Sequence, residues 1–171
     1  EIMEYGAAIV SLRPFGDVDV VGGFDTLEAY TQDTSNQGAI VGRVANRIAN
    51  ARFKIDGKVY MLPDNDNGNC LHGGIGFQHR LWKVVDYTEN SIALSYLSPD
   101  GEDGFPANLQ IDVSYTLKDA AIIISYTATP DGKTPIALTN HAFFNLDGFG
   151  GDIKEHTVQI WADSYSEVND K

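Results

Sequence analysis

The first stretch with chemically capable side chains is Gly42–Asn50, which holds two arginines and two asparagines. Arg43 and Arg47 are four positions apart, and Asn46 precedes the second arginine. Guanidinium and amide groups together offer a fork of hydrogen-bond donors that suits hydroxyl oxygens. The alternative is a pair of exposed arginines that balance an acidic surface, and the spacing alone favours this structural interpretation.

Two histidines lie in surroundings rich in glycine or asparagine. His72 precedes two glycines in Leu71–Gly74, which let the backbone approach a ligand or let the chain reverse. His141 leaves a strand-like run into the aromatic, asparagine-flanked stretch 139–146. An imidazole pKa of about 6.5 suits proton exchange near neutral pH. The alternatives are a turn residue capped by the backbone for His72 and a core histidine bonded to a carbonyl for His141.

Aromatic side chains near these histidines allow two interpretations. Phe143 and Phe144 are predicted to belong to the core, although one of them could stack on the apolar face of a sugar ring. His156 alternates with apolar residues in 156–162 and is expected to be structural. Three further rings, those of Phe77, His79 and Trp82, could either pack in the core or contact a ligand.

Other site chemistry has no support in the sequence. The run Asp64–Gly68 is similar to a calcium loop, but its glycine comes one position early and Ile75 stands where a bidentate carboxylate belongs. Zinc-binding spacings, phosphate-binding loops and a G-x-S-x-G nucleophile elbow do not occur. Cys70 is expected to be a small thiol, buried or partly exposed, rather than one of a thiolate pair with His72. We therefore expect no metal site.

The composition is that of a globular domain with a strongly acidic balance. Of 171 residues, 12 are Lys or Arg and 24 are Asp or Glu, which gives a formal net charge of −12. This balance disfavours binding to nucleic acid or to an anionic membrane. No apolar run approaches the roughly 18 residues of a membrane-spanning helix. The single cysteine excludes an internal disulfide and fits a reducing compartment, so we expect a cytoplasmic location.

Residues 43–83 depart from this balance, with seven Lys and Arg against three Asp, a net charge of +4. Chance clustering on a solvated face is the simpler interpretation. The alternative is a local cationic pocket for an oxygen-rich ligand.

A period of two dominates the hydrophobic pattern, as in half-buried β-strands. Residues 109–117 alternate, 121–129 follow after a hairpin-length linker, and Asp56-Gly57 fits a type I′ turn between 52–55 and 58–62. Further strands are predicted at 5–12, 81–86, 91–97, 135–139 and 156–162, and one short helix at 25–31. The predicted fold class is all-β, an antiparallel β-sandwich formed by one domain.

Taken together, five of these motifs resemble a known family. GRVANRIA, ARFKIDGKVYMLPDN, LHGG with GFQHRLW, SPDGEDGFPANL and NHAFFNL occur in this order over nearly the whole chain. The series is similar to the aldose 1-epimerases, or galactose mutarotases. The resemblance implies a galactose mutarotase-like supersandwich and an isomerase of hexose metabolism. Such an enzyme interconverts the α and β anomers of a free aldohexose, such as galactose or glucose, by proton transfers at oxygen that need no cofactor.

The resemblance also implies roles for individual residues. His141 in NHAFFNL matches the catalytic acid that donates a proton to the ring oxygen. Asn46 and Arg47 match a sugar-binding pair, and His72 in LHGG matches a second sugar-contacting histidine. Phe143 matches a position that often lies against the sugar.

Members of this family are considerably longer than 171 residues. Their catalytic Glu and a sugar-binding Asp lie in a second half, and no motif here matches either. We therefore expect residues 1–171 to be a single partial domain, the N-terminal half of a mutarotase-like sandwich, with a missing C-terminal half as its partner. Three alternatives remain: a non-catalytic carbohydrate-binding β-domain, an inert remnant, and a relative that acts on hexose 6-phosphates.

Overall fold

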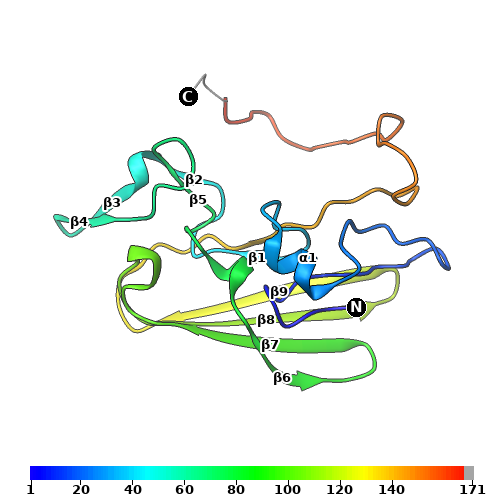
Figure 1. The fold of residues 1–171 in the computed structure, drawn as a ribbon, viewed down its shortest axis with the longest axis horizontal. Coiled ribbons are helices and arrows are strands. Elements are labelled where there is room, and N and C mark those ends of the chain that lie inside the picture. The colour runs from blue at the N-terminus through cyan, green and yellow to red at the C-terminus, as the bar shows by residue number, and fades with distance from the viewer. Residues whose placement is uncertain (168–171) are drawn as a thin grey trace.

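The computed structural model describes residues 1–167 and is organised around a four-stranded antiparallel sheet (Figure 1). Its strands, in the order β6-β7-β8-β9, are β6 (Lys83–Tyr87), β7 (Ser91–Ser98), β8 (Leu109–Lys118) and β9 (Ala121–Pro130). The strands predicted at 91–97 and 121–129 are confirmed. The alternation predicted for 109–117 is confirmed by four buried side chains, those of Leu109, Ile111, Val113 and Tyr115.

Three short antiparallel ladders carry most of the polar motifs. They pair β1 with β10, β2 with β5 and β3 with β4. Their bounds are Ile40–Val41 (β1), Thr139–Asn140 (β10), Arg47–Ile48 (β2), Cys70–Leu71 (β5), Arg52–Ile55 (β3) and Lys58–Met61 (β4). The β3–β4 hairpin turns at Asp56 and Gly57, whose φ angles of 49° and 86° are both positive, as a type I′ turn requires.

Helical structure is limited to short segments. The predicted helix is α1 (Leu27–Gln32), and Thr26 caps it by accepting the N–H of Ala29 at 3.3 Å. The 3-10 turns are η1 (Ala49–Ala51), η2 (Phe77–His79) and η3 (Glu102–Gly104). Within residues 1–167, none of the helices has the length and apolar character needed to cross a membrane.

Two apolar cores hold these elements together. In the larger core, buried residues of the N-terminal segment and β1 pack against the four-stranded sheet. Figure 1 shows that these segments lie over one face of the sheet. Its members include Ile9, Val20, Ile40, Phe77, Trp82, Leu94 and Ile111. The smaller core comprises Ala51, Leu62, Cys70 and Phe105. The smaller core supports the segments around β2 and β5, which carry two of the candidate site motifs.

Two predicted strands are replaced by bridges or are much shortened. Residues 5–12 make isolated bridges rather than a strand, because Gly6 and Ala7 adopt positive φ angles of 67° and 46° that interrupt an extended backbone. Within 135–139, only Thr139 enters a ladder.

The strand predicted at 156–162 does not form, and its side chains apart from His156 are exposed. A strand needs a neighbour to satisfy its backbone hydrogen bonds, and no ladder within residues 1–167 includes this segment. His156 therefore does not lie on a strand face. It lies in a loop, where its Nε2 accepts the N–H of Leu146 at 3.0 Å.

Candidate active site

Asn46 and His72 face each other across the end of the β2–β5 ladder. The N–H of His72 donates to the carbonyl of Asn46 at 3.0 Å, and the N–H of Asn46 donates to Nδ1 of His72 at 3.1 Å. An imidazole nitrogen that accepts a hydrogen bond carries no proton, so neutral His72 carries its proton on Nε2. The backbone thus sets both the place and the tautomer of this histidine.

The glycine that follows His72 is required by a close backbone approach. Gly73 has a φ of +80°, and a Cβ at this position would lie 2.2 Å from the carbonyl oxygen of Gly42. A side chain would therefore separate the turn after β5 from the segment that leads into Asn46. The two glycines of the LHGG motif let the chain reverse, which is one of the two roles that the sequence left open.

His141 is held by the ladder between β1 and β10. Its N–H donates to the carbonyl of Ala39 at 2.8 Å, and its carbonyl accepts the N–H of Gly38 at 3.1 Å. The side chain of Asn140 adds two contacts, from Nδ2 to the Gly38 carbonyl at 2.6 Å and from the Ala142 N–H to Oδ1 at 2.9 Å. The backbone on both sides of His141 is therefore tied down, which limits where its imidazole can lie.

The rings of three predicted site residues form one cluster. The imidazoles of His72 and His141 have centroids 5.0 Å apart and are nearly perpendicular, at 84°. The ring of Phe143 lies 5.2 Å from that of His141. Burial, then the neighbouring His141 and Arg47, lowers the pKa of His72 below its usual value, and Asp66 opposes this shift. His72 is therefore neutral at neutral pH.

Arg47 lies beside this cluster and is oriented by an acidic partner. Its Nε donates to Oδ2 of Asp66 at 2.5 Å, and its Nη1 donates to Oδ1 of Asn46 at 3.2 Å. Sequence reasoning missed Asp66, which belongs to the run that was rejected as a calcium loop. In the same run, Asn65 accepts the N–H of Leu71 at 2.7 Å and donates to the carbonyls of Leu71 and Gly74 at 3.0 and 3.2 Å. The run therefore holds the site motifs in place.

Arg43 does not join Arg47 in a fork of donors. Its side chain is buried, and its guanidinium donates to Ser98 Oγ, Thr134 Oγ1 and four backbone carbonyls, those of Ser98, Pro99, Pro106 and Ala107. The two arginines thus have different roles, Arg43 inside the protein and Arg47 at the surface. The spacing of four does not place them on one face, because the chain between them is not helical.

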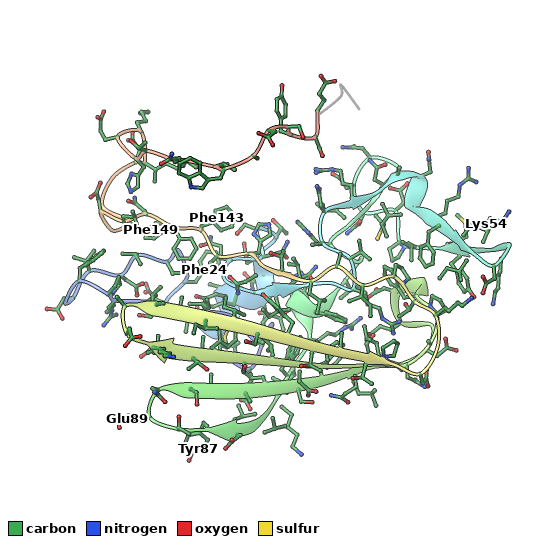
Figure 2. The ribbon with its side chains drawn as sticks, turned by 180° about the vertical axis from the view of Figure 1, so that it is seen from behind. Phe24, Lys54, Tyr87, Glu89, Phe143 and Phe149 are labelled. Carbon is green, nitrogen blue, oxygen red and sulfur yellow. The ribbon has the colours of Figure 1, made fainter. Side chains whose placement is uncertain are left out.

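The aromatic residues singled out in the sequence also separate into buried and exposed ones. Phe77 and Trp82 are core residues. Phe143 and Phe144, predicted to be core, are 45% and 51% exposed, since the chain leaves the β1–β10 ladder at this point and runs over the surface. Figure 2 shows Phe143 on the same side of the sheet as Phe24 and Phe149, below the C-terminal segment. The exposure of Phe143 leaves its ring able to contact a ligand.

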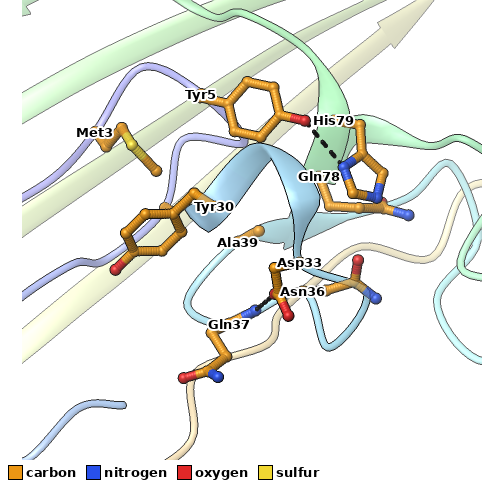
Figure 3. Close-up of a pocket in the computed structure, with 10 residues that line it drawn as sticks. Met3, Tyr5, Tyr30, Asp33, Asn36, Gln37, Ala39, Gln78 and His79 are labelled. Carbon is orange, nitrogen blue, oxygen red and sulfur yellow. Dashed lines mark hydrogen bonds between the residues drawn. The ribbon is translucent and has the colours of Figure 1, made fainter. Parts of the chain in front are cut away.

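His79 lies apart from the imidazole pair, in a small pocket beside α1 (Figure 3). The hydroxyl of Tyr5 is 3.0 Å from Nδ1 of His79, and the cavity of about 10 Å³ is large enough for about one water molecule. A sugar does not fit there. Cys70 is fully buried, which confirms the first of the two placements expected for it, and burial raises the pKa of its thiol to about 11, so the thiol keeps its proton near neutral pH.

The chemistry available at the cluster is proton exchange and hydrogen bonding to oxygen. Half-buried imidazoles at His72 and His141 lie near an exposed guanidinium and an exposed amide, those of Arg47 and Asn46. In the part of the chain that the structure covers, no group of three or more His, Cys, Asp or Glu side chains could hold a metal ion. The arrangement suits a polyhydroxylated ligand that is bound by donors and acceptors.

Comparison with known proteins gives these residues a family context. The sequence model described as "Aldose 1-epimerase" matches residues 1–171. Galactose mutarotase from Rattus norvegicus is 45% identical over 176 residues, which cover 99% of this chain and 51% of that protein. Aldose 1-epimerase from Escherichia coli K12 is 40% identical over 175 residues, with the same coverage. The chain spans about half the length of these curated relatives.

Solved structures agree with the sequence comparison. An aldose epimerase homologue from C. elegans superposes with a TM-score of 0.81 and 39% identity, over 86% of this chain and 47% of that one. Galactose 1-epimerase from Lactobacillus acidophilus NCFM gives a TM-score of 0.76 and 28% identity, over 85% and 45% of the two chains. The predicted galactose mutarotase-like sandwich fold is thereby confirmed, and the chain belongs to the aldose 1-epimerase family.

Proposed function

We propose that this chain carries part of the active site of an aldose 1-epimerase that interconverts the α and β anomers of a free aldohexose. The observation that supports this most directly is the contact between the imidazoles of His72 and His141, which are 69 residues apart in the sequence and come from separate ladders. The names of the relatives, galactose mutarotase and aldose 1-epimerase, suggest galactose and related aldoses as substrates.

In the proposed reaction, His141 acts as the acid. It donates a proton to the ring oxygen while a base removes the proton of the anomeric hydroxyl, so that the bond between C1 and the ring oxygen breaks and an aldehyde forms. Rotation about the C1–C2 bond and closure on the other face give the second anomer and return both protons. On the resemblance to the family, the base is a Glu outside residues 1–171.

The remaining site residues bind the sugar in this proposal. Arg47 and Asn46 donate to ring hydroxyls, and Arg47 also stabilises negative charge that develops at oxygen. Neutral His72 offers its Nε2 proton to another hydroxyl. Phe143 lies against an apolar face of the ring. The single buried cysteine fits a cytoplasmic location, which we include in the proposal.

The test is polarimetry of freshly dissolved α-galactose and α-glucose. We expect negligible turnover by the chain alone, and turnover when the C-terminal half of the rat galactose mutarotase is added. His141→Ala should abolish that turnover, whereas His156→Ala, a matched change at a loop histidine outside the cluster, should retain it. Turnover that survives His141→Ala would remove the acid from the proposal.

Calorimetric titration with the same sugars separates the alternatives. Binding without turnover in the presence of the second half would support a non-catalytic carbohydrate-binding domain, and no binding at all would support an inert remnant. A hexose 6-phosphate is disfavoured because three arginines of the cationic segment already have partners within the protein. Arg43 is buried, Arg47 pairs with Asp66, and Arg80 pairs with Glu102 and Asp103.

A further inference from the structure

The carboxylate of Asp103 lies directly behind the turn that carries His72. Its Oδ1 accepts the N–H of Ile75 at 3.3 Å, and its Oδ2 accepts the N–H of Gly76 at 3.1 Å. We propose that Asp103 is a positioning residue, which holds the 72–76 turn and thereby the imidazole of His72. The proposal rests on the proposed function only in assigning His72 a contact with sugar.

The surroundings of Asp103 make this carboxylate a fixed support. Its side chain is only 9% exposed, and its Oδ2 also accepts from Nη2 of Arg80 at 3.1 Å. Arg80 in turn pairs through Nε with Glu102 at 3.3 Å. A carboxylate that accepts from two backbone N–H groups and a guanidinium has little freedom to move.

Gly74 gives independent support, because the turn leaves room for Asp103 at this position. A Cβ on Gly74 would lie 2.9 Å from Cγ of Pro63, and 3.2 Å and 3.3 Å from Oδ1 and Cβ of Asp103, and the φ of Gly74 is +93°. The first glycine of LHGG admits the Gly42 carbonyl, and the second admits the Pro63 ring and the Asp103 carboxylate. Both glycines therefore allow the turn to lie close against its neighbours.

Buried Arg43 anchors the loop that presents Asp103. Its guanidinium contacts Ser98 and Pro99 at one end of this loop and Pro106 and Ala107 at the other. Arg43 also precedes Asn46, which bonds to His72. The 98–107 loop thus links the two site motifs, through Arg43 on one side and through Asp103 on the other.

The turn is also held by Asn65, whose side chain forms hydrogen bonds with Leu71 and Gly74. Removal of the Asp103 carboxylate should release residues 75 and 76 while Asn65 still holds the beginning of the turn. We therefore expect a local change in the 72–76 turn, which carries His72, rather than loss of the fold.

The experiment is NMR of the full chain and of Asp103→Asn. In the unmodified protein we expect slow amide exchange at Ile75 and Gly76 and a single Nε2–H tautomer of His72. In Asp103→Asn we expect exchange at these two amides to be on the order of tenfold faster, because the charged acceptor is lost, and a mixture of His72 tautomers. Asp103→Glu, which retains the charge, should restore both signals in part.

Asp100→Asn is the matched control. It removes the same charge from the same loop, but Asp100 accepts the N–H of Ala107 and not one from the 72–76 turn. We expect the His72 signals of this variant to stay as in the unmodified protein. Equal effects of the two variants would overturn the proposal, because a general loosening of the loop would then explain them.

One further outcome decides the proposal, and a second measurement separates it from the proposed function. Fast exchange at Ile75 and Gly76 in the unmodified protein overturns it even if Asp103→Asn does not fold. Titration with galactose, followed at the same histidine signals, tests the proposed function separately. Absence of sugar binding contradicts that function, while the exchange and tautomer results still decide the role of Asp103.

Discussion

Arg43 places a positive charge inside the protein, where four backbone carbonyls and two hydroxyls surround it. Burial lowers the pKa of its guanidinium, and the nearby carboxylate of Glu102 opposes this shift. Ser98 connects the two groups, because its hydroxyl lies 2.8 Å from Nη2 of Arg43 and donates to Glu102 at 2.5 Å. Such a network is stable when all its members are satisfied and costly when one is removed.

We therefore expect Arg43→Met to reduce the free energy of unfolding by about 3–5 kcal/mol, since the carbonyls around it would lose their donors. Urea unfolding followed by circular dichroism measures this. Arg52→Met, at an exposed arginine of β3, is the control and should change stability by less than about 0.5 kcal/mol. Similar losses in the two variants would contradict the role of Arg43.

At the same scale, the lowered pKa of His72 predicts a pH dependence of stability. The unfolded chain has the ordinary histidine pKa of about 6.5, and the folded chain binds this proton less readily. The stability that neutral His72 contributes to the folded chain is therefore fully present above about pH 6.5. It is lost as the pH falls through the lower pKa of the folded state. Protonation of Nδ1 would also break its contact with the N–H of Asn46.

The measurement compares urea unfolding of the unmodified chain and His72→Gln at pH 7.5 and 5.5. We expect the unmodified chain to lose more stability between these pH values than the variant does. His79, whose pKa is also lowered by burial, is present in both proteins and cancels in the comparison. An identical pH dependence would mean that His72 titrates alike in the folded and unfolded chains.

At the scale of elements, the site depends on how closely the turn after β5 approaches the segment before β2. Gly73 and Gly57 have similar backbone angles, with φ of +80° and +86°, but different surroundings. A Cβ at Gly57 would have no neighbour within 4 Å, whereas one at Gly73 would collide with the Gly42 carbonyl. Substitution of Gly57 therefore tests backbone strain alone, whereas substitution of Gly73 tests strain together with a steric collision.

We expect Gly57→Ala to lower the free energy of unfolding by about 1–2 kcal/mol, which is the strain of a left-handed alanine. Gly73→Ala should lower it by roughly 1–3 kcal/mol more, because the turn after β5 and the Gly42 segment must move apart. Thermal and urea unfolding measure both variants, and NMR of His72 should change only in Gly73→Ala. If the two substitutions cost the same, the close approach at Gly73 contributes nothing to stability.

At the scale of the whole molecule, much apolar surface is exposed. A hollow of about 1350 Å³ opens between the N-terminal segment and one end of the sheet, with a lining that includes Ile2, Leu12, Phe15, Ile92, Leu117 and Phe144. The edge strand β9 is ten residues long and exposes Ile123 and Tyr126. Long apolar edges and patches of this kind promote association.

We therefore expect the 171-residue chain to self-associate or to unfold with low cooperativity. Sedimentation and circular dichroism melting measure this. Ile123→Lys, which places a charge on the β9 edge, should reduce association, and Val59→Lys on the β3–β4 hairpin should have little effect. A monomeric chain with a sharp, cooperative melt would contradict this expectation.

Local pattern alone determined several features of this protein. The period-two runs predicted β7, β8 and β9, and Asp56-Gly57 predicted the β3–β4 turn, because side-chain alternation and positive φ are properties of neighbouring residues. The ordered motifs were sufficient to indicate the family and to name His72 and His141, which the structure brings into contact.

Only the tertiary structure decided which polar residues lie at the surface beside the two histidines and which are buried behind them. Arg43 and Arg47 look alike in the sequence, but Arg43 is buried by a loop more than 50 residues further along the chain. Asp66 and Asp103 gained their roles through partners that no local pattern identifies. The failed strand at 156–162 has the same physical cause: burial and backbone pairing are properties of neighbours in space, and alternation along the chain does not supply those neighbours.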